Sequence, residues 1–168
     1  PALAAATYYF GLQALLLTAV CIAASVLSEY IIRKFVMKRD NTVSDLSAAV
    51  TGLLLALNLP VTMPLWMAAI GSVFAIVVIK QLFGGLGQNF VNPAIASRIF
   101  LVVSFTSQMT HWVQPGTDAV ASATPLVQLA QKSPDLPSLW NMFIGNRAGS
   151  MGETCILALL IGGVFLMA

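Results

Sequence analysis

The sequence predicts an all-α membrane protein, a polytopic transmembrane helical bundle in which several helices are short or broken. Of its 168 residues, 58% are hydrophobic and only 8% are charged, whereas soluble domains carry about 25% charged residues. A soluble fold could not hide so much apolar surface from water. The basic residues form no stripe along the sequence, so nucleic acid is not expected as a partner.

Five or six apolar segments follow one another along the chain. They cover residues 1–10, 12–32, 44–58, 63–79, 93–105 and 154–168. Crossing about 30 Å of hydrocarbon takes about 20 residues, so the third and fifth segments should tilt, thin the bilayer or be broken helices. Broken helices commonly line transporter binding sites. The chain begins and ends within apolar stretches, and we therefore expect 1–168 to be a single membrane domain belonging to a longer protein.

Positive charge predicts the orientation of these segments. The loop after the second segment contains the basic residues Arg33, Lys34, Lys38 and Arg39. Loops rich in lysine and arginine remain in the cytoplasm. Counting alternate crossings from there places Lys80 and the turn after it in the cytoplasm and residues 106–150 in an external loop. This parity fails if one of the short segments is re-entrant.

A glycine-rich turn separates two of the apolar segments. It reads Gly84-Gly85-Leu86-Gly87-Gln88-Asn89-Phe90-Val91-Asn92-Pro93. Glycine permits positive φ and close backbone approach, and irregular backbone at a membrane survives only in a protein-lined or wet cavity. Asn92 is a good N-cap for a helix that begins at Pro93. Asn89 and Asn92 contact a cofactor, join an internal polar network or cap helices, and the residues alone leave these alternatives open.

Two acidic residues at segment ends each allow a structural and a functional interpretation. Asp45, between Ser44 and Ser47, caps segment 44–58 or binds an ion. Glu153 opens the last helix, where it favours the helix dipole or shapes a pocket together with the preceding glycines.

Two further charges lie near predicted cytoplasmic ends. Arg98 snorkels to the cytoplasmic face or neutralises an anionic group. Glu29 is expected to form an interfacial pair near Tyr30 and Arg33.

The external loop contains a run of small residues around a hydroxyl, Asp118-Ala119-Val120-Ala121-Ser122-Ala123-Thr124-Pro125. Nothing bulky blocks approach to Thr124, and Pro125 stiffens the backbone after it. A small-residue turn is the ordinary explanation of such a run. No base is adjacent to Thr124 in the sequence and His111 is distant, so the pattern does not favour a hydrolase nucleophile.

Four stretches, in this order, carry a resemblance to a known family: SDLSAAVTGLLLALNLP, KQLFGGLGQNFVNPA, DAVASATPL and GNRAGSMGETCILALLIGG. The chain resembles the D subunit of the Rnf complexes, which are ion-pumping ferredoxin:NAD oxidoreductases. A close relative of that protein is the B subunit of the sodium-pumping NADH:quinone reductase. The resemblance extends from Phe10 to Ala168 and corresponds to the N-terminal half of such a protein.

The resemblance implies a covalently bound flavin. In the family, FMN is joined through its phosphate to a threonine hydroxyl. Thr124 matches that threonine, and Asp118 matches the acid that precedes it. Ala121 and Ser122 depart from the family pattern but remain small residues.

The resemblance implies a second cofactor, and the residues weighed above provide further candidates for the site. The family also implies a noncovalent riboflavin. Candidate cofactor-binding residues beside Thr124 are Asp118, Ser122, Asn89, Asn92, Arg98 and Glu153. Asp45 and Glu153 are the candidates for ion coupling, while neither catalytic residues nor metal ligands are implied.

The predicted function is that of an electron-transfer membrane subunit carrying covalent FMN within an ion-pumping ferredoxin:NAD oxidoreductase. The implied partners are the A-, B-, C-, E- and G-type subunits of that complex, sodium or protons, and the lipid bilayer. The implied location is the bacterial cytoplasmic (inner) membrane, crossed several times, with the Thr124 loop outside and a repeat resembling that of urea transporters. The alternatives are the B subunit of the quinone reductase and a solute channel or transporter without a redox role.

Overall fold

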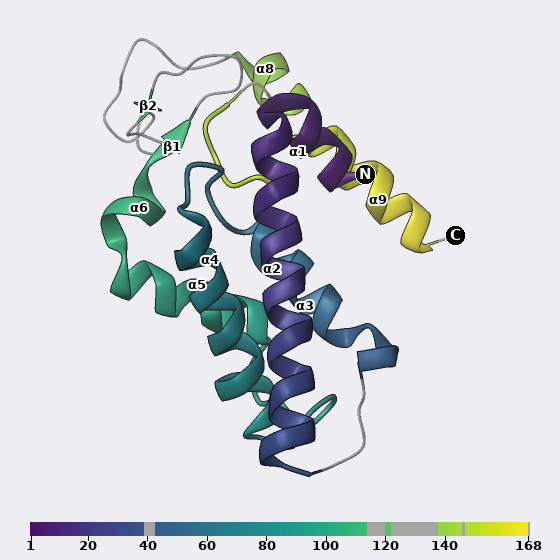
Figure 1. Ribbon diagram of the computed structural model, residues 1–168. Coiled ribbons are helices and arrows are strands. Elements are labelled where there is room, and N and C mark those ends of the chain that lie inside the picture. The colour runs from purple at the N-terminus through teal and green to yellow at the C-terminus, as the bar shows by residue number, and fades with distance from the viewer. Residues whose placement is uncertain (39–42, 114–119, 122–137, 146, 168) are drawn as a thin grey trace. The chain divides into compact units, whose positions relative to one another are not determined.

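The computed structural model describes residues 1–38, 43–113, 120–121, 138–145 and 147–167, and within them the chain is mostly helical (Figure 1). The α-helices are α1 (Ala2–Phe10), α2 (Leu12–Ile31), α3 (Ser47–Leu57), α4 (Leu65–Phe74), α5 (Pro93–Ser104), α6 (Thr106–Thr110), α8 (Leu139–Ile144) and α9 (Ile156–Met167). A 3₁₀ turn, η2 (Val43–Asp45), precedes α3, and two π-helices, η1 (Ile32–Val36) and η3 (Ala75–Gln81), continue α2 and α4. The predicted all-α class is confirmed for the described residues.

One short hairpin is the exception to the helical fold. Strands β1 (Trp112–Val113) and β2 (Val120–Ala121) pair antiparallel, with Trp112 opposite Ala121. Together with α6 and α8, this hairpin lies within residues 106–150, for which the sequence predicts an external loop. Short elements of local structure therefore interrupt this stretch, and its external position remains a prediction.

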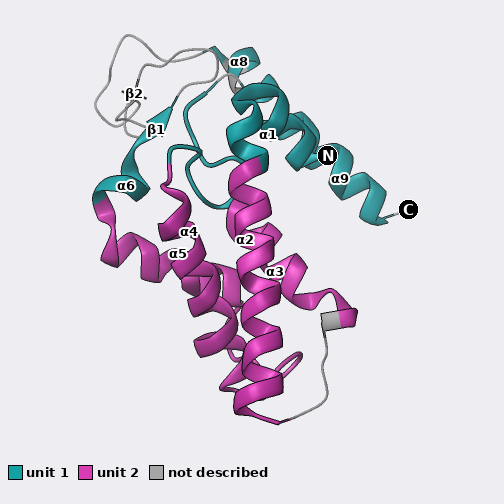
Figure 2. Cartoon of the chain, viewed as in Figure 1, with its two compact units in different colours: residues 1–15, 57–62, 107–168 teal, residues 16–56, 63–106 magenta. Residues whose placement is uncertain are grey.

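The chain divides into two compact units, which are described separately (Figure 2). Unit 2 consists of Leu16–Ala56 and Met63–Thr106. Its fully buried apolar side chains include Leu17, Leu55, Ile76 and Leu101. The rings of Phe74 and Phe100 stack with centroids 4.2 Å apart, and Ser97 Oγ donates to the Gly71 carbonyl at 2.6 Å. These contacts hold α4 against α5.

Small residues bring α2 and α3 close together within unit 2. A Cβ on Gly52 would lie 2.7 Å from the Cys21 carbonyl oxygen and 2.9 Å from Ile22 Cα. Only glycine fits at this contact, as is common where membrane helices pack through small residues.

Unit 1 consists of Pro1–Leu15, Leu57–Thr62 and Ser107–Ala168. Its loops are tied together by backbone contacts. The amides of Met151 and Gly152 donate to the carbonyls of Leu59 and Leu57 at 3.3 and 2.8 Å. In addition, Tyr9 Oη donates to the Ile144 carbonyl at 3.0 Å and so links α1 to the end of α8.

Among the described residues, one continuous helix is long and apolar enough to cross a membrane, Leu12–Val36, with 25 residues. The other apolar helices are shorter, namely Ser47–Leu57, Leu65–Gln81, Pro93–Ser104 and Ile156–Met167. The short segments that the sequence predicts are therefore present as short helices. The repeat resembling urea transporters remains a prediction.

Candidate functional site

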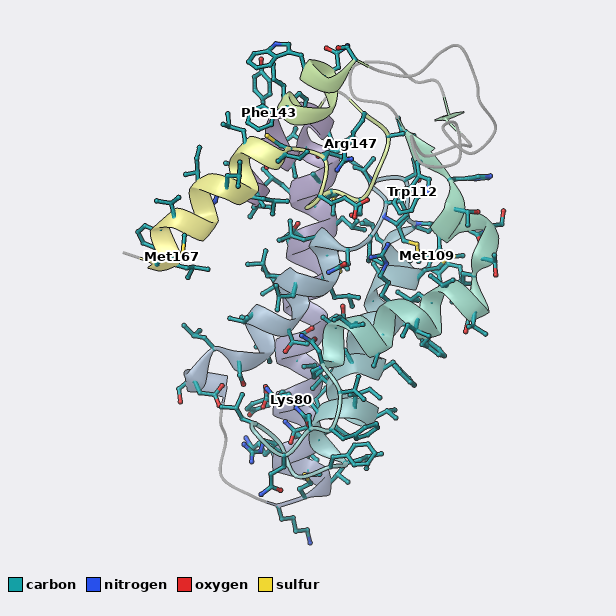
Figure 3. All side chains as sticks on the ribbon, turned by 180° about the vertical axis from the view of Figure 1, so that it is seen from behind. Lys80, Met109, Trp112, Phe143, Arg147 and Met167 are labelled. Carbon is teal, nitrogen blue, oxygen red and sulfur yellow. The ribbon has the colours of Figure 1, made fainter. Side chains whose placement is uncertain are left out.

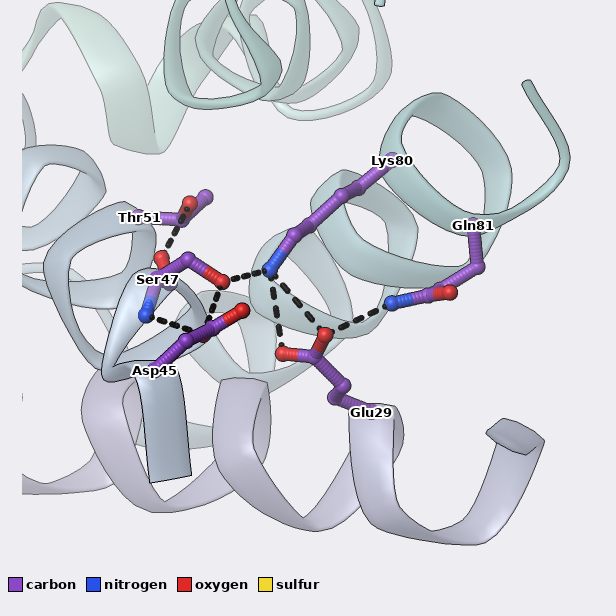
Figure 4. A network of polar contacts seen from close by, with 6 residues as sticks. All are labelled: Glu29, Asp45, Ser47, Thr51, Lys80 and Gln81. Atoms are coloured by element: carbon purple, nitrogen blue, oxygen red, sulfur yellow. Dashed lines mark hydrogen bonds and ion pairs between the residues drawn. The ribbon is translucent and has the colours of Figure 1, made fainter. Parts of the chain in front are cut away.

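A buried ion pair joins α2 to η3 in the interior of unit 2 (Figures 3 and 4). Lys80 Nζ lies 3.1 and 3.0 Å from the two carboxylate oxygens of Glu29. The side chains are 2% and 1% exposed. Burying either charge alone would be very unfavourable, so each residue makes the burial of the other tolerable.

Two further side chains complete the coordination of this pair. Gln81 Nε2 donates to Glu29 Oε1 at 2.8 Å, and Lys80 Nζ also donates to Ser47 Oγ. Ser47 Oγ in turn donates to Asp45 Oδ1 at 2.6 Å. A continuous chain of polar contacts therefore runs from a buried carboxylate, Glu29, to an exposed one, Asp45 (Figure 4).

Asp45 is the solvent-exposed end of this network, and it also hydrogen-bonds the first residue of α3. The Ser47 backbone N–H donates to Asp45 Oδ1 at 2.8 Å. The Ser47 hydroxyl, followed by its backbone N–H and the charges of Lys80 and Arg33, lowers the pKa of Asp45 against a smaller opposing effect of burial. Asp45 therefore accepts a hydrogen bond from the first backbone N–H of α3, which agrees with the capping interpretation, while ion binding remains a prediction.

Both elements that carry the ion pair change to π geometry close to it. Residues 32–36 follow Glu29 by one turn, and residues 75–81 include Lys80 and Gln81. Single π turns are rare and are often found at functional sites. The wider π turn reduces the angle between consecutive side chains, which allows Lys80 and Gln81, although adjacent in sequence, to reach one carboxylate.

The glycine turn closes the end of η3 directly behind Lys80. Gly84, Gly85 and Gly87 have φ of 113°, 100° and 80°, values that favour glycine. The Gly85 amide donates to the Lys80 carbonyl at 3.0 Å. With its amide oriented to match its neighbours, Asn89 donates to the carbonyls of Ile79, Lys80 and Gly85 at 3.1, 3.1 and 3.3 Å. Asn89 therefore caps η3 and holds Lys80 in position.

Asn92 acts as the predicted N-cap of α5. Its Oδ1 accepts from the Ala94 amide at 3.0 Å, and Pro93 occupies the first turn. Arg98 is half-buried on the next turn of α5. The hydrogen bonds of Asn89 and Asn92 to backbone groups account for both residues structurally, and their contact with a cofactor remains a prediction.

Glu153 belongs to unit 1 and lies outside the charge network. Its Oε1 accepts from the Ser150 amide at 3.4 Å, and its carbonyl accepts from Arg147 Nη2 at 2.8 Å. The prediction that Glu153 opens the last helix is wrong, because α9 begins at Ile156 and has no acid in its first turn. Glu153 instead stabilises the turn before that helix.

The predicted flavin residues Asp118, Ser122 and Thr124 lie outside the described residues. Unit 2 contains a groove of about 370 Å³, lined only by apolar side chains of α4, η3 and α5. Ligand sites need a few polar groups to orient their ligand. This groove therefore does not suit a polar flavin ring.

The central feature of the site was not predicted from the sequence. Glu29 was expected at an interface with Tyr30 and Arg33, but it is buried against Lys80, a residue 51 positions later. The available signal was that one acid and one base stand alone in otherwise apolar segments. Such charges pair with one another inside a membrane bundle.

The comparisons with known proteins agree on one family. The profile of the NQR2, RnfD, RnfE family matches residues 1–168. The chain is 51% identical to the D subunit of the Na(+)-translocating ferredoxin:NAD(+) oxidoreductase complex of Acetobacterium woodii, over 99% of this chain and 54% of that protein. It is 41% identical to the D subunit of the proton-translocating ferredoxin:NAD(+) oxidoreductase complex of Clostridium ljungdahlii, again over 99% of this chain and 54% of that protein.

A third relative belongs to an NADH-quinone reductase. The chain is 42% identical to the B subunit of the Na(+)-translocating NADH-quinone reductase of Pseudoalteromonas atlantica, over 70% of this chain and 30% of that protein. The chain spans about half the length of the two D subunits that it matches.

Proposed function

Because the chain belongs to the NQR2, RnfD, RnfE family, we propose that it is part of an electron-transfer membrane subunit of an ion-translocating ferredoxin:NAD oxidoreductase. The observation that carries this proposal is the match to two D subunits over 99% of the chain. The match to the B subunit of a quinone reductase covers 70%, which makes that complex the second candidate. The partners are then the A-, B-, C-, E- and G-type subunits.

The proposed cofactor is FMN bound through its phosphate to Thr124. The stretch from Asp118 to Thr124 supports it, since the residues before the threonine are mostly small and the family pattern is retained at its acid and its threonine. Bound FMN would supply one- and two-electron chemistry. The contribution of Thr124 is attachment, which fixes the distance of the flavin from the next electron carrier. A noncovalent riboflavin belongs to the same proposal.

The proposed location is the bacterial cytoplasmic membrane, crossed several times. The helix Leu12–Val36 is long enough to span it, and Arg33 and Lys34 at its end predict that this end is cytoplasmic. The glycine turn belongs to the same end of unit 2, because Arg33 Nη2 is 4.0 Å from a Cβ built on Gly85. This agrees with the parity derived from the sequence and supports an external Thr124.

The charge network of unit 2 is the proposed place of ion coupling, and Asp45 is its accessible member. An acid buried in a membrane helix is a functional candidate by default, and Glu29 is 1% exposed. One of the two D subunits belongs to a sodium-translocating complex and the other to a proton-translocating complex. The comparisons therefore do not identify the coupling ion of this chain. Glu153 remains a separate candidate in unit 1.

Flavin fluorescence of the denatured subunit tests the proposal. We expect a fluorescent band from the whole subunit after denaturing electrophoresis, its loss in Thr124→Ala and its retention in the matched variant Ser122→Ala. Undiminished fluorescence of Thr124→Ala would refute attachment at this residue. A subunit without any flavin, bound or extractable, would favour the channel or transporter alternative.

A further inference from the structure

The turn after η3 exposes four large apolar side chains at one end of unit 2. Leu82, Phe83, Leu86 and Phe90 are 67%, 47%, 69% and 71% exposed. Phe83 and Phe90 pack edge to face, with ring centroids 4.8 Å apart. Exposed apolar side chains gathered in this way are unfavourable in water and indicate an interaction surface.

The end of α2 adds basic and aromatic side chains to this surface. Lys34 Nζ donates to Tyr30 Oη at 2.7 Å, and it lies 5.1 Å from the ring centroid of Tyr30 and 5.9 Å from that of Phe35. Phe35 is 65% exposed, and both Lys34 and Lys38 are exposed. Arg33 Nη2 lies 4.0 Å from the position that a Cβ on Gly85 would take, which places the two segments at the same end of unit 2 (Figure 1). We call Tyr30, Lys34, Phe35, Lys38, Leu82, Phe83, Leu86 and Phe90 the interfacial collar.

The polarity of the collar determines the depth at which it can lie. Irregular backbone and exposed polar groups such as Gln88 exclude the turn from the hydrocarbon core. The exposed phenylalanine and leucine side chains in turn make a position in bulk water unfavourable. The level that suits both is the boundary between headgroups and acyl chains, where aromatic and long basic side chains concentrate.

The net charge of the collar is positive. Glu29, the nearest buried acid, is already neutralised by Lys80 at 3.0 Å. Asp45 is the exposed acid described at this end, and Ser47 together with the charges of Lys80 and Arg33 stabilises it. Within the described part of the chain, neither Lys34 nor Lys38 forms an ion pair with a carboxylate. Both ammonium groups belong to exposed side chains at the end of unit 2 that also exposes the apolar residues of the turn.

We propose that the interfacial collar binds anionic phospholipid, with Lys34 and Lys38 contacting phosphate and Phe83, Leu86 and Phe90 contacting the upper acyl chains. Basic residues immediately cytoplasmic to a membrane helix attract anionic lipid. A phosphate complements the two ammonium groups in charge, which favours lipid over an apolar protein partner. The inference rests on the membrane location proposed above and is independent of the flavin.

Lipid retention by the whole subunit tests the charge contacts. The protein is reconstituted in nanodiscs of phosphatidylglycerol and phosphatidylcholine and extracted in mild detergent, and the retained lipids are quantified by mass spectrometry. We expect selective retention of phosphatidylglycerol to fall several-fold in Lys34→Gln/Lys38→Gln. The control Arg147→Gln removes a basic residue of unit 1 and should leave retention unchanged.

A spin label tests the depth of the collar. The label is attached to Leu86→Cys in a whole subunit that lacks Cys155 and any cysteine beyond residues 1–168, while Cys21 is buried. Its collisions with oxygen and with a water-soluble nickel chelate should place it at the level of the headgroups. Unchanged phosphatidylglycerol retention in the lysine double variant overturns the proposal. So does a label at position 86 that is shielded from both reagents, since this would indicate that protein and not lipid covers the collar. Neither measurement depends on Thr124. The lipid result can therefore be interpreted even if Thr124 proves not to carry a flavin.

Discussion

Lys80 Nζ lies 3.0 Å from Glu29 Oε2, and the two side chains are 2% and 1% exposed. The residues are 51 positions apart in sequence, so their pairing fixes η3 against α2. The capped glycine turn holds the backbone of Lys80 from the other side. Removal of one partner would leave a charge in an apolar interior, whereas removal of both would leave none.

The first prediction follows from this asymmetry. Lys80→Met should lower the stability of the whole subunit, with a loss of about 3–5 kcal/mol, the usual consequence of leaving a buried charge unpaired. Glu29→Met/Lys80→Met should recover most of the loss, because apolar side chains replace the pair. The measurement is the midpoint of thermal unfolding in detergent. Equal losses in the single and double variants would show that packing, and not charge, is what the pair contributes.

The helices and their caps could be predicted from the sequence because they depend on local patterns. Apolar runs placed all the principal helices, and Asn92 followed by Pro93 marked the start of α5. The family predicted from four stretches is confirmed by its profile. Glu153 was misplaced because the turn around it, closed by Arg147 and Ser150, delays α9 to Ile156.

The ion pair could not be predicted with the same rules, since it joins distant segments. Sequence neighbours suggested Tyr30 and Arg33 for Glu29, but the π turn of η3 brings Lys80 and Gln81 to it instead. Neither the apolar composition nor the helix period predicts a π turn. The flavin stretch is a separate matter, because Thr124 lies outside the described residues and its role rests on resemblance.

The second prediction concerns the contact between α2 and α3. Gly52→Ala should cost about 1–3 kcal/mol of stability, the usual range for overpacking, because its Cβ would lie 2.7 Å from the backbone oxygen of Cys21. The matched control is Gly163→Ala in α9, where nothing lies within 4 Å of the new Cβ. Alanine there should be neutral or stabilising by up to about 1 kcal/mol. Similar unfolding midpoints for both variants would argue against the close contact.

The third prediction is the sidedness of the chain. In a subunit without Cys155 and without any cysteine beyond residues 1–168, Lys38→Cys should react with a membrane-impermeant maleimide only after the membrane is opened. His111→Cys should react in intact cells. Both positions are exposed, so accessibility within the protein does not limit the reaction. The basic residues at the end of α2 motivate the assignment. External labelling of residue 38 would reverse the orientation and place Thr124 in the cytoplasm.

The fourth prediction tests Asp45 as the accessible end of the charge network. Asp45→Asn should reduce ion-dependent turnover more than it reduces flavin content. Asparagine can still accept the Ser47 N–H, whose bond to Asp45 Oδ1 is 2.8 Å, and it caps helices about as well as aspartate, so chiefly the charge is lost.

The pH dependence of stability provides a second readout for Asp45. Ser47 lowers the pKa of Asp45, so its stabilising contribution is fully present above the unfolded pKa of about 3.9 and is lost as the pH falls through the lower folded pKa. Asp45→Asn should remove this loss of stability at low pH, which is small because the side chain is exposed. The control Glu153→Gln removes an acid of unit 1 and should still lose stability as Asp45 is protonated. If Asp45→Asn turns over with normal ion dependence while its acid-side stability changes, Asp45 is only a cap. Coupling would then depend on Glu29, on Glu153, on the part of the subunit beyond residues 1–168, or on another protein of the complex.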